Sequence, residues 1–281
     1  MDVFDAPGLV RAWSDRMHRD HRTIGLVPTM GALHAGHAAL IDEARRRCDD
    51  VVVSIFVNPL QFNAPSDFAS YPRPIDDDLE TCARAGVSVV YAPTAAAMYP
   101  TGFQTHVEPG QLADRFEGEH RPGHFRGVTT VVSKLFAAVL PDVALFGQKD
   151  AQQLAIIRRM NLDLDQGVRI VALPTIREHD GLALSSRNRR LTAADRAAAV
   201  CLWHALRAAT RLVSAGECSA AMIEAAVVAA VAAEPSARLE YAAVVHPESF
   251  ELIQSVGSEA LIVVAAWFGD VRLIDNIVVS A

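Results

Sequence analysis

Two histidines three residues apart are the most informative feature of this sequence. Residues 28–37 read PTMGALHAGH and follow a predicted strand over 24–28, so His34 precedes and His37 opens a predicted helix over 36–47. Backbone N–H groups at a helix start, together with two imidazoles, can line a site of phosphate size. We therefore expect a phosphate site here. Two alternatives stay open: a pair of structural histidines, and a metal site, which would need a third ligand.

A lysine marks the end of a second predicted strand. Residues 146–150 read FGQKD, and Lys149 is one of only two lysines among the 26 basic residues. Its flexible ammonium can reach a triphosphate, and Asp150 can cap a helix or accept hydrogen bonds from ribose hydroxyls. The alternative is a surface lysine beside a helix cap. Residues 121–190 hold 11 cations and 6 anions in a chain of net charge −7, and a local positive field of this kind suits a polyanionic ligand.

Three further polar segments could complete such a site. Leu184–Asn188 reads LSSRN, where hydroxyls beside an arginine can form a flexible phosphate clamp or simply an ordinary polar linker. Gln61 lies in the segment VNPLQF, which follows a strongly apolar run, and ligands bind at such strand ends of a parallel sheet. The acidic run Asp76–Asp78 could help to hold Mg²⁺, or could simply favour a helix start.

An alternation of strands and helices must position these residues. Short apolar runs alternate with helical patterns up to about residue 175, which predicts a parallel, doubly wound α/β sheet. From about residue 192 two alanine-rich helices precede three strands, which predicts a smaller C-terminal α+β domain. The expected elements are strands at 24–28, 51–57, 87–91, 143–146, 168–172, 239–245, 261–268 and 271–277, helices at 36–47, 129–139, 150–159, 193–213 and 220–233, and an acidic helix start at 75–79.

Composition and missing motifs exclude several classes of protein. Hydrophobic residues make up 51% of the 281, which argues against disorder, and net charge −7 argues against a nucleic-acid binder. We find no apolar run long enough to cross a membrane and no signal-peptide core. Four scattered cysteines fit a reduced cytoplasm. The sequence has no P-loop, no GxGxxG fingerprint after a strand and no GxSxG elbow.

Seven segments, in order, resemble one known family. Together they are similar to the pantoate–β-alanine ligase family of the HxGH nucleotidyltransferase superfamily, which is related to class I aminoacyl-tRNA synthetases. They span residues 27 to 276 and read VPTMGALHAGH, SIFVNPLQF, YPR with the acidic run, HFRGV, FGQKDAQQL, PTIREHDGLALSSRN and RLIDN.

The resemblance implies a fold and a reaction. It implies a Rossmann-like ATP- and pantoate-binding domain over 1–176, a smaller lid domain over 177–281 and a homodimer. The expected location, from the cysteines and the absence of signal and membrane segments, is the cytoplasm. The resemblance also implies two steps: the pantoate carboxylate attacks the α-phosphate of MgATP to give pantoyl adenylate and pyrophosphate, and β-alanine then displaces AMP to give pantothenate. Expected partners are these small molecules, with no nucleic acid and no membrane.

The resemblance also assigns residues by motif. His34, His37 and Lys149 would stabilise the phosphates, with His37 as proton donor, and Ser185, Ser186 and Arg187 would complete the catalytic set. Gln61 and Gln153 would hold pantoate, with Gln61 also near β-alanine, and Asp77 and Asp78 would support Mg²⁺. The expected ATP contacts are Met30, Gly31, Ala32, Leu33, His34, Ala35, Gly36, His37, Gly147, Gln148, Lys149, Asp150, Ile176, Leu184, Ser185, Ser186 and Arg187.

Two rival functions remain open from sequence. One is another HxGH nucleotidyltransferase that transfers AMP to a phosphorylated acceptor; the SSRN segment, the VNPLQF strand end and the separate C-terminal domain count against it. The other is a catalytically silent module that binds nucleotide or metal through the histidine pair. AMP formation that requires ATP, Mg²⁺, pantoate and β-alanine together would distinguish the ligase from both.

Overall fold

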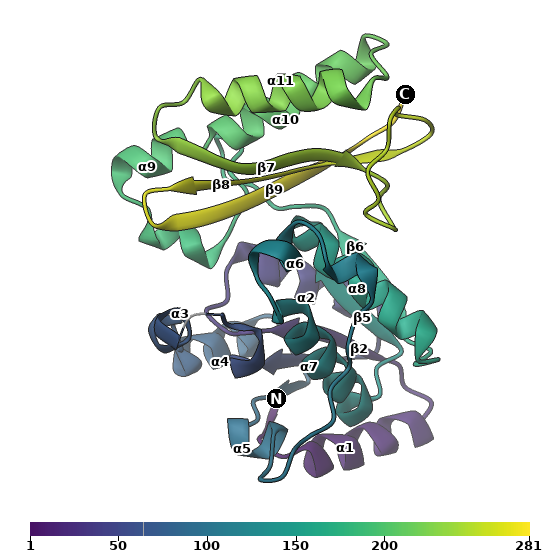
Figure 1. The fold of residues 1–281 in the computed structure, drawn as a ribbon. Coiled ribbons are helices and arrows are strands. Elements are labelled where there is room, and N and C mark those ends of the chain that lie inside the picture. Colours follow the sequence, from purple (N-terminus) through teal and green to yellow (C-terminus); the bar gives the residue numbers. More distant parts are fainter. Residues whose placement is uncertain (64) are drawn as a thin grey trace. The chain divides into compact units, whose positions relative to one another are not determined.

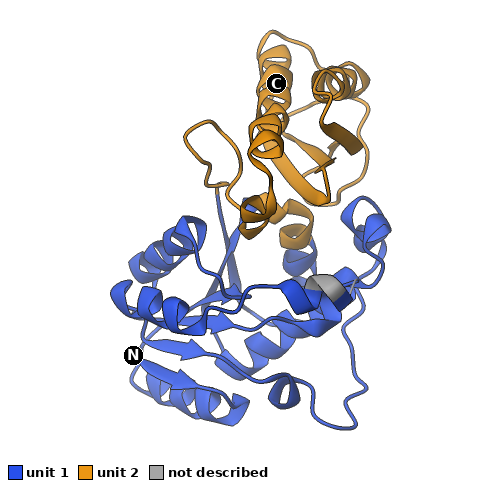
Figure 2. Ribbon diagram, turned by 90° about the vertical axis from the view of Figure 1, so that its left-hand side faces the viewer, with its two compact units in different colours: residues 1–148, 156–173 blue, residues 149–155, 174–281 orange. Residues whose placement is uncertain are grey.

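The chain divides into two compact units. The structure is a computed structural model that describes residues 1–63 and 65–281. The domain boundary was expected at residue 176; the chain leaves the first unit at Lys149, returns at Ile156 and leaves again at Pro174. Figure 2 colours the two units, which are unit 1 (residues 1–148 and 156–173) and unit 2 (residues 149–155 and 174–281).

Unit 1 is built on a parallel sheet. In the described part of the chain its six strands follow the order β1-β4-β3-β2-β5-β6, and every neighbouring pair runs parallel (Figure 1). The predicted doubly wound α/β class is therefore confirmed. The strands are β1 (Asp2–Phe4), β2 (Ile24–Thr29), β3 (Asp50–Ile55), β4 (Val89–Tyr91), β5 (Val143–Gly147) and β6 (Arg169–Leu173).

Helices cover the sheet because its strands are apolar on both faces. Leu40, Ile41 and Ala44 of α2 pack against one set of alternating strand residues, including Val27 and Val53. On the other face α7 contacts β2 and also packs beside α1. The helices of unit 1 are α1 (Pro7–Arg19), α2 (Ala35–Arg47), α3 (Pro65–Ser70), α4 (Ile75–Arg84), α5 (Ala95–Met98), α6 (Glu117–His120) and α7 (His124–Val139); α8 (Ala151–Asp163) belongs to both units.

The order of the strands creates a switch point between β2 and β5. From β2 the chain moves to β3 and β4 on one side, and later to β5 and β6 on the other side. In open α/β sheets, ligands bind outside the carboxyl ends of the strands where the order reverses in this way. The segment after β2 contains the histidine pair, and the segment after β5 leads to Lys149. The fold thus starts both motifs at neighbouring strand ends.

Unit 2 is the smaller α+β part of the chain. Its antiparallel sheet has the order β7-β8-β9, and Gly269 and Asp270 form the turn between the last two strands. The single helix expected over 193–213 is wrong, because a turn at residues 199–200 divides it into two helices, although both turn residues keep helical backbone angles. The elements are α9 (Ala193–Ala198), α10 (Cys201–Ser214), α11 (Ala220–Ala232), β7 (Ala237–Val245), β8 (Ala260–Phe268) and β9 (Val271–Val279).

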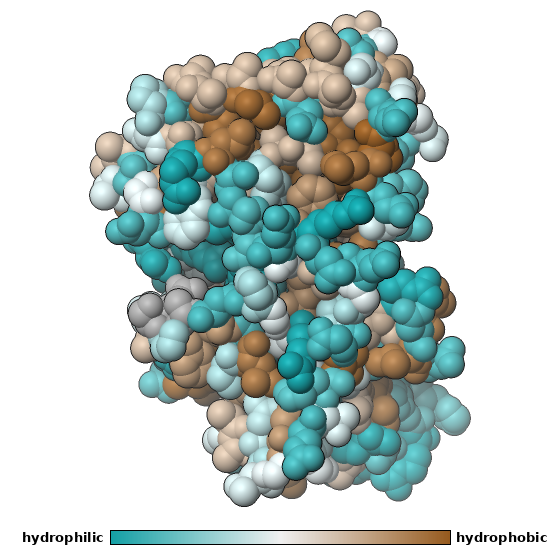
Figure 3. Space-filling view, viewed as in Figure 1, coloured by the Kyte–Doolittle hydropathy of each residue, from teal (hydrophilic) through white to brown (hydrophobic). Residues whose placement is uncertain are grey.

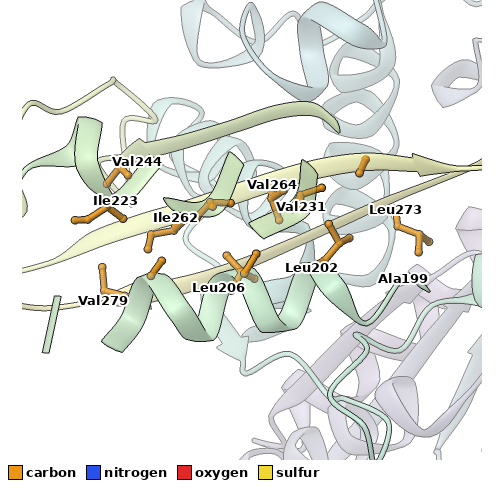
Figure 4. Packing of buried hydrophobic residues seen from close by; sticks show 14 of the residues in the cluster. Ala199, Leu202, Leu206, Ile223, Val231, Val244, Ile262, Val264, Leu273 and Val279 are labelled. Atoms are coloured by element: carbon orange, nitrogen blue, oxygen red, sulfur yellow. The ribbon is translucent and has the colours of Figure 1, made fainter. Parts of the chain in front are cut away.

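A continuous apolar core joins these helices to their sheet. Figure 4 shows Leu202 and Leu206 of α10 turned toward the strands, where Ile262 and Val264 of β8 lie. All four side chains are almost completely buried, and each such burial contributes about 1.5–3 kcal/mol relative to exposure. The alanine-rich helices contribute small side chains to this core, and Ala205 of α10 is fully buried there.

The surface mixes polar and apolar side chains. On the face seen in Figure 3, hydrophobic patches are interrupted by hydrophilic side chains. Among the described residues, no helix has the length and apolar character needed to cross a membrane.

Candidate active site

The two histidines form a mutual cap at the start of α2. His34 occupies the N-cap position, and its Nδ1 accepts a hydrogen bond from the backbone N–H of Gly36 at 3.1 Å. Nδ1 of His37 accepts from the backbone N–H of His34 at 3.2 Å. The ring centroids are 4.1 Å apart. Because both Nδ1 atoms act as acceptors, each neutral ring has its proton on Nε2, the atom with which it can donate to an anionic oxygen.

The loop before this cap has an unusual backbone. Gly31 has φ of +81° and Ala32 has φ of +51°, both in the left-handed region. The left-handed conformation costs an alanine about 1–2 kcal/mol. Asp78, near the start of α4, offsets this cost: its Oδ2 accepts from the Ala32 N–H at 2.8 Å, and its Oδ1 accepts from the Leu33 N–H at 2.7 Å. The backbone that leads to the histidines is therefore held by a carboxylate 45 residues away along the chain.

Gln61 sits in a short turn where its side chain is held from two sides. The turn is a 3₁₀ helix, η1 (Pro59–Gln61), directly after β3. Nδ2 of Asn58 donates to Oε1 of Gln61 at 3.1 Å, and the Gln61 amide nitrogen contacts the sulfur of Met30 at 3.0 Å. The structure thus brings together two residues predicted on separate motifs, Met30 and Gln61.

Asn58 organises this turn, and sequence reasoning assigned it no role. Its side chain is 1% exposed. Besides Gln61, its Nδ2 donates to the carbonyl of Gly127 at 3.0 Å, and its Oδ1 accepts from the Leu60 N–H at 3.2 Å and the Tyr99 hydroxyl at 2.8 Å. Burial raises the pKa of Tyr99, which keeps that hydroxyl neutral and able to donate. An Asn just before a Pro-initiated turn is a capping signal that could have revealed it.

Two residues at and just before the start of α7 contact the backbone carbonyl of Gln61. Nδ1 of His124 lies 2.8 Å from the Gln61 carbonyl oxygen, and a guanidinium nitrogen of Arg121 donates to that oxygen at 3.4 Å. The helix starts at His124, five residues before the expected start, because Gly123 provides a left-handed residue at the N-cap position. The HFRGV segment noted in the sequence therefore serves as a support for Gln61.

Gly127 allows α7 to touch the turn. A Cβ atom at this position would lie 2.4 Å from the Leu60 carbonyl oxygen and 2.7 Å from the Gln61 nitrogen. Both neighbours are backbone atoms, so no side-chain rotation could relieve the overlap. Close approach of two backbones is the physical reason for a glycine here.

In unit 2, Lys149 is fixed through its own backbone. Nδ2 of Asn276, in β9, donates to the Lys149 carbonyl at 2.8 Å. The ammonium lies 3.7 Å from a carboxylate oxygen of Asp150, and the lysine side chain is 19% exposed. The RLIDN segment, which the sequence singled out without a role, therefore includes the residue that anchors Lys149.

Strand β9 also anchors Arg177, which lies at the start of the segment that leads to SSRN. Arg177 donates to both carboxylate oxygens of Asp275, at 2.6 and 3.0 Å. Its guanidinium carbon also lies 3.9 Å from the ring centroid of Trp203. A bidentate pair combined with a stacked ring fixes a guanidinium in one orientation. Two neighbouring residues of β9, Asp275 and Asn276, thus anchor two separate predicted motifs.

The SSRN segment forms a 3₁₀ turn, η4 (Ser186–Arg190). The hydroxyl of Ser185 accepts from the Arg187 N–H at 3.2 Å and so caps this turn. Nδ2 of Asn188 donates to the Ala183 carbonyl at 3.0 Å and to Glu178 at 2.9 Å. Ser185 is consequently engaged as a cap, while Ser186 and Arg187 are partly exposed.

Two acidic residues in this segment share one cation. Arg196 contacts Glu178 at 2.7 Å and Asp180 at 2.9 Å. Hydrogen bonds from Arg196 lower the pKa of both carboxyl groups. The loop between Arg177 and Asn188 is thereby stabilised by charge as well as by backbone pairing.

The predicted site residues fall in both units. The contacts above lie within one unit or the other. Unit 1 contains Met30, Gly31, Ala32, Leu33, His34, Ala35, Gly36, His37, Gln61, Asp77, Asp78, Gly147 and Gln148, and unit 2 contains Lys149, Asp150, Gln153, Ile176, Leu184, Ser185, Ser186 and Arg187.

No protein-only metal cage is visible among the residues that the structure describes, since no group of three or more His, Cys, Asp or Glu side chains is placed to hold an ion. Mg²⁺ in nucleotide sites usually binds through one or two carboxylates together with phosphate oxygens and water. Asp77 is exposed and fits this mode, whereas both oxygens of Asp78 accept backbone hydrogen bonds.

Comparison with known proteins places this geometry in a family. A family model described as pantoate-beta-alanine ligase matches residues 2–278. The pantothenate synthetase of Heliobacterium modesticaldum is 51% identical over 269 residues, which cover 96% of both chains. That of Geobacter sulfurreducens is 47% identical over 280 residues, covering 100% of this chain and 99% of the relative.

Solved structures agree over the full length. The pantothenate synthetase of Thermus thermophilus superposes with a TM-score of 0.93 at 44% identity and covers 99% of each chain. The pantoate-beta-alanine ligase of Francisella tularensis, solved in complex with beta-gamma ATP and beta-alanine, has a TM-score of 0.81 at 34% identity, covering 99% of this chain and 97% of that one. With the histidine cap after β2 and these matches, the chain belongs to the pantoate–β-alanine ligase family.

Proposed function

We propose that His34, His37 and Lys149 stabilise the charge that moves onto pyrophosphate while this ligase adenylates pantoate. The chain is an ATP-dependent ligase that condenses pantoate with β-alanine through pantoyl adenylate. In the first step a pantoate carboxylate oxygen attacks the α-phosphorus and the bond to pyrophosphate breaks. In the second, the β-alanine amine attacks the acyl carbon, AMP leaves and the amine loses a proton.

The observation that carries this proposal is the mutual cap of the two histidines. Because each Nδ1 accepts a backbone N–H, each neutral ring has its donor on Nε2. The start of α2 adds backbone N–H groups and the positive end of the helix dipole. Preorganised donors of this kind stabilise developing charge without reorganising during the reaction. His37 is the proposed proton donor in the sense that its Nε2–H donates a hydrogen bond to the departing pyrophosphate.

Gln61 and Gln153 are the proposed pantoate-holding residues. Support for Gln61 comes from the hydrogen bond of Asn58 to its side-chain oxygen, which leaves the amide in one orientation. A fixed amide can hold a polar substrate in one pose, and correct positioning supplies a large share of the rate of a bimolecular step. Gln153, on α8, is assigned to pantoate by motif. Ser185, Ser186 and Arg187 are assigned by motif to ATP contact and catalysis.

ATP and Mg²⁺ are the proposed nucleotide substrate and its ion. The Francisella tularensis relative was solved with an ATP compound and beta-alanine, which supports both as substrates here. Mg²⁺ would neutralise charge on the phosphates, and exposed Asp77 would help to hold it. No covalent enzyme intermediate is required, because the carboxylate is activated as a mixed anhydride with AMP.

A homodimer in the cytoplasm is the proposed working form. The cysteines at 48, 82, 201 and 218 are free thiols, which suits a reducing compartment. Light scattering of the purified protein tests the dimer, and a mass of 30.3 kDa, that of one chain, would refute it.

The function is tested by following pantoate-dependent exchange of pyrophosphate into ATP. Lys149→Ala is expected to lower this exchange by about 10²–10³-fold, the scale for losing one preorganised donor. Exchange at the wild-type rate in this variant would refute the role of the lysine. The matched control is Lys134→Ala, which removes the other lysine, whose ammonium lies 5.4 Å from the ring of Phe103, and it should leave exchange unchanged.

A further inference from the structure

The buried carboxylate of Asp78 has contacts that suit a structural task better than metal binding. The residue is 2% exposed. Each of its two oxygens accepts a backbone N–H, one from Ala32 and one from Leu33, at 2.8 and 2.7 Å. Hydrogen bonds to an ionised acceptor are about twice as strong as neutral ones. The carboxylate also lies in the first turn of α4, where the helix dipole favours its negative charge.

The loop at residues 31–33, which Asp78 holds by hydrogen bonds, leads directly into the start of α2. Gly31 and Ala32 have left-handed backbone angles, which an alanine adopts only when its surroundings enforce them. Leu33 is followed directly by His34, the N-cap residue whose ring and backbone form the mutual cap with His37. A change in the loop would therefore move the first residue of the cap, and both rings with it.

We propose that Asp78 is a positioning residue of the adenylation step: it holds the turn at residues 31–33 and thereby places His34 and His37. Metal binding falls to its exposed neighbour Asp77. A hydrated Mg²⁺ retains several waters when it binds protein, whereas Asp78 is 2% exposed and each of its oxygens already accepts a backbone N–H. This inference rests on the proposed role of the histidines, but its structural part can be tested without substrate.

The first test measures amide hydrogen exchange in metal-free wild-type protein. The N–H groups of Ala32 and Leu33 are expected to be protected, because Asp78 accepts them with no ion present. Rapid exchange of both in the absence of Mg²⁺ would overturn the inference. This measurement needs no variant, so it remains valid even if changes at Asp78 impair folding, and it does not depend on catalysis by the histidines.

The second test uses Asp78→Asn, which has nearly the same shape but replaces one acceptor oxygen with a donor. One of the two loop N–H groups then faces an NH₂ group. We expect loss of its protection and a fall of about 10- to 100-fold in kcat for exchange per folded molecule. The Mg²⁺ concentration for half-maximal rate should stay at the wild-type value. Retained protection with an increased Mg²⁺ requirement would show a metal ligand instead and refute the proposal.

Asp77→Asn is the matched control. It makes the same chemical change one residue earlier, at an exposed position. Protection of the loop N–H groups should persist in this variant. Loss of protection there would mean that general destabilisation of α4, rather than the grip of Asp78, sets the loop, and would overturn the inference.

Discussion

Replacing Gly127 with alanine tests whether the contact between α7 and the Gln61 turn matters for pantoate. The added Cβ would lie 2.4 Å from the Leu60 carbonyl oxygen, while ordinary contact begins at 3.4 Å. The helix and the turn must therefore separate by about 1 Å. The same movement stretches the 3.0 Å hydrogen bond from Asn58 to the Gly127 carbonyl.

The magnitude follows from this displacement. Overpacking of a well-packed contact costs about 1–3 kcal/mol of stability, so the variant should fold but melt at a lower temperature. A misplacement of about 1 Å at a substrate-positioning group can lower the rate by about 10²-fold. Since Gln61 is the proposed pantoate residue, we expect kcat/KM for pantoate to fall by that factor, and kcat/KM for ATP to change much less.

The assay is pyrophosphate exchange with pantoate and ATP varied separately. Gly8→Ala is the matched control, because a Cβ at Gly8 meets nothing within 4 Å and the residue lies in α1; its kinetics should equal those of the wild type. Wild-type kcat/KM for pantoate in Gly127→Ala would refute the argument that this contact sets the position of Gln61. An equal loss of kcat/KM for pantoate and for ATP would refute the argument that the contact acts specifically on pantoate binding.

Two further predictions concern unit 2. Asn276→Ala removes the hydrogen bond to the Lys149 carbonyl and should lower the exchange rate about 2- to 10-fold, the scale of one hydrogen bond. If Asn276→Ala lowers the rate by a similar factor in a protein that already has Lys149→Ala, the effect does not act through the lysine. Arg196→Gln removes the partner of Glu178 and Asp180, whose pKa values it lowers. A depressed folded-state pKa stabilises above the unfolded pKa, and this contribution is lost as pH falls through the folded value. The variant should therefore melt below the wild type at pH 7, with the gap closing below about pH 4; a gap in Tm that stays constant with pH would contradict this.

The sequence predicted the sheet well because its signal is local. Buried parallel strands are continuous apolar runs, and β2, β3, β5 and β6 follow such runs closely. Strand β1 and helix α1 were missed. Asp2–Phe4 is too short and too polar for its sequence to indicate a strand, and only its pairing with β4 defines it. Helix α7 was expected to begin at Thr129, because the segment HFRGV was placed before the helix and not in its first turn.

The sequence predicted contacts within the candidate site only between residues that are close along the chain. His34 and His37 are three residues apart, so their spacing alone predicted that their side chains would lie together at the start of a helix. The supports of Gln61 were not predictable, because Tyr99 reaches Asn58 from 41 residues away and His124 reaches Gln61 from 63. Pairings over such distances leave no periodic signal in a single sequence.

The anchoring of Lys149 by Asn276 has a consequence for how the protein is made. The two residues are 127 positions apart, so a ribosome must add the whole of α9, α10, α11 and the last sheet before the lysine turn acquires its partner. Every strand of the first sheet has by then been synthesised, and domains generally fold as they emerge. The nascent chain can thus complete the first sheet while Lys149 still lacks its hydrogen bond from Asn276, so this anchor forms only when translation is almost finished.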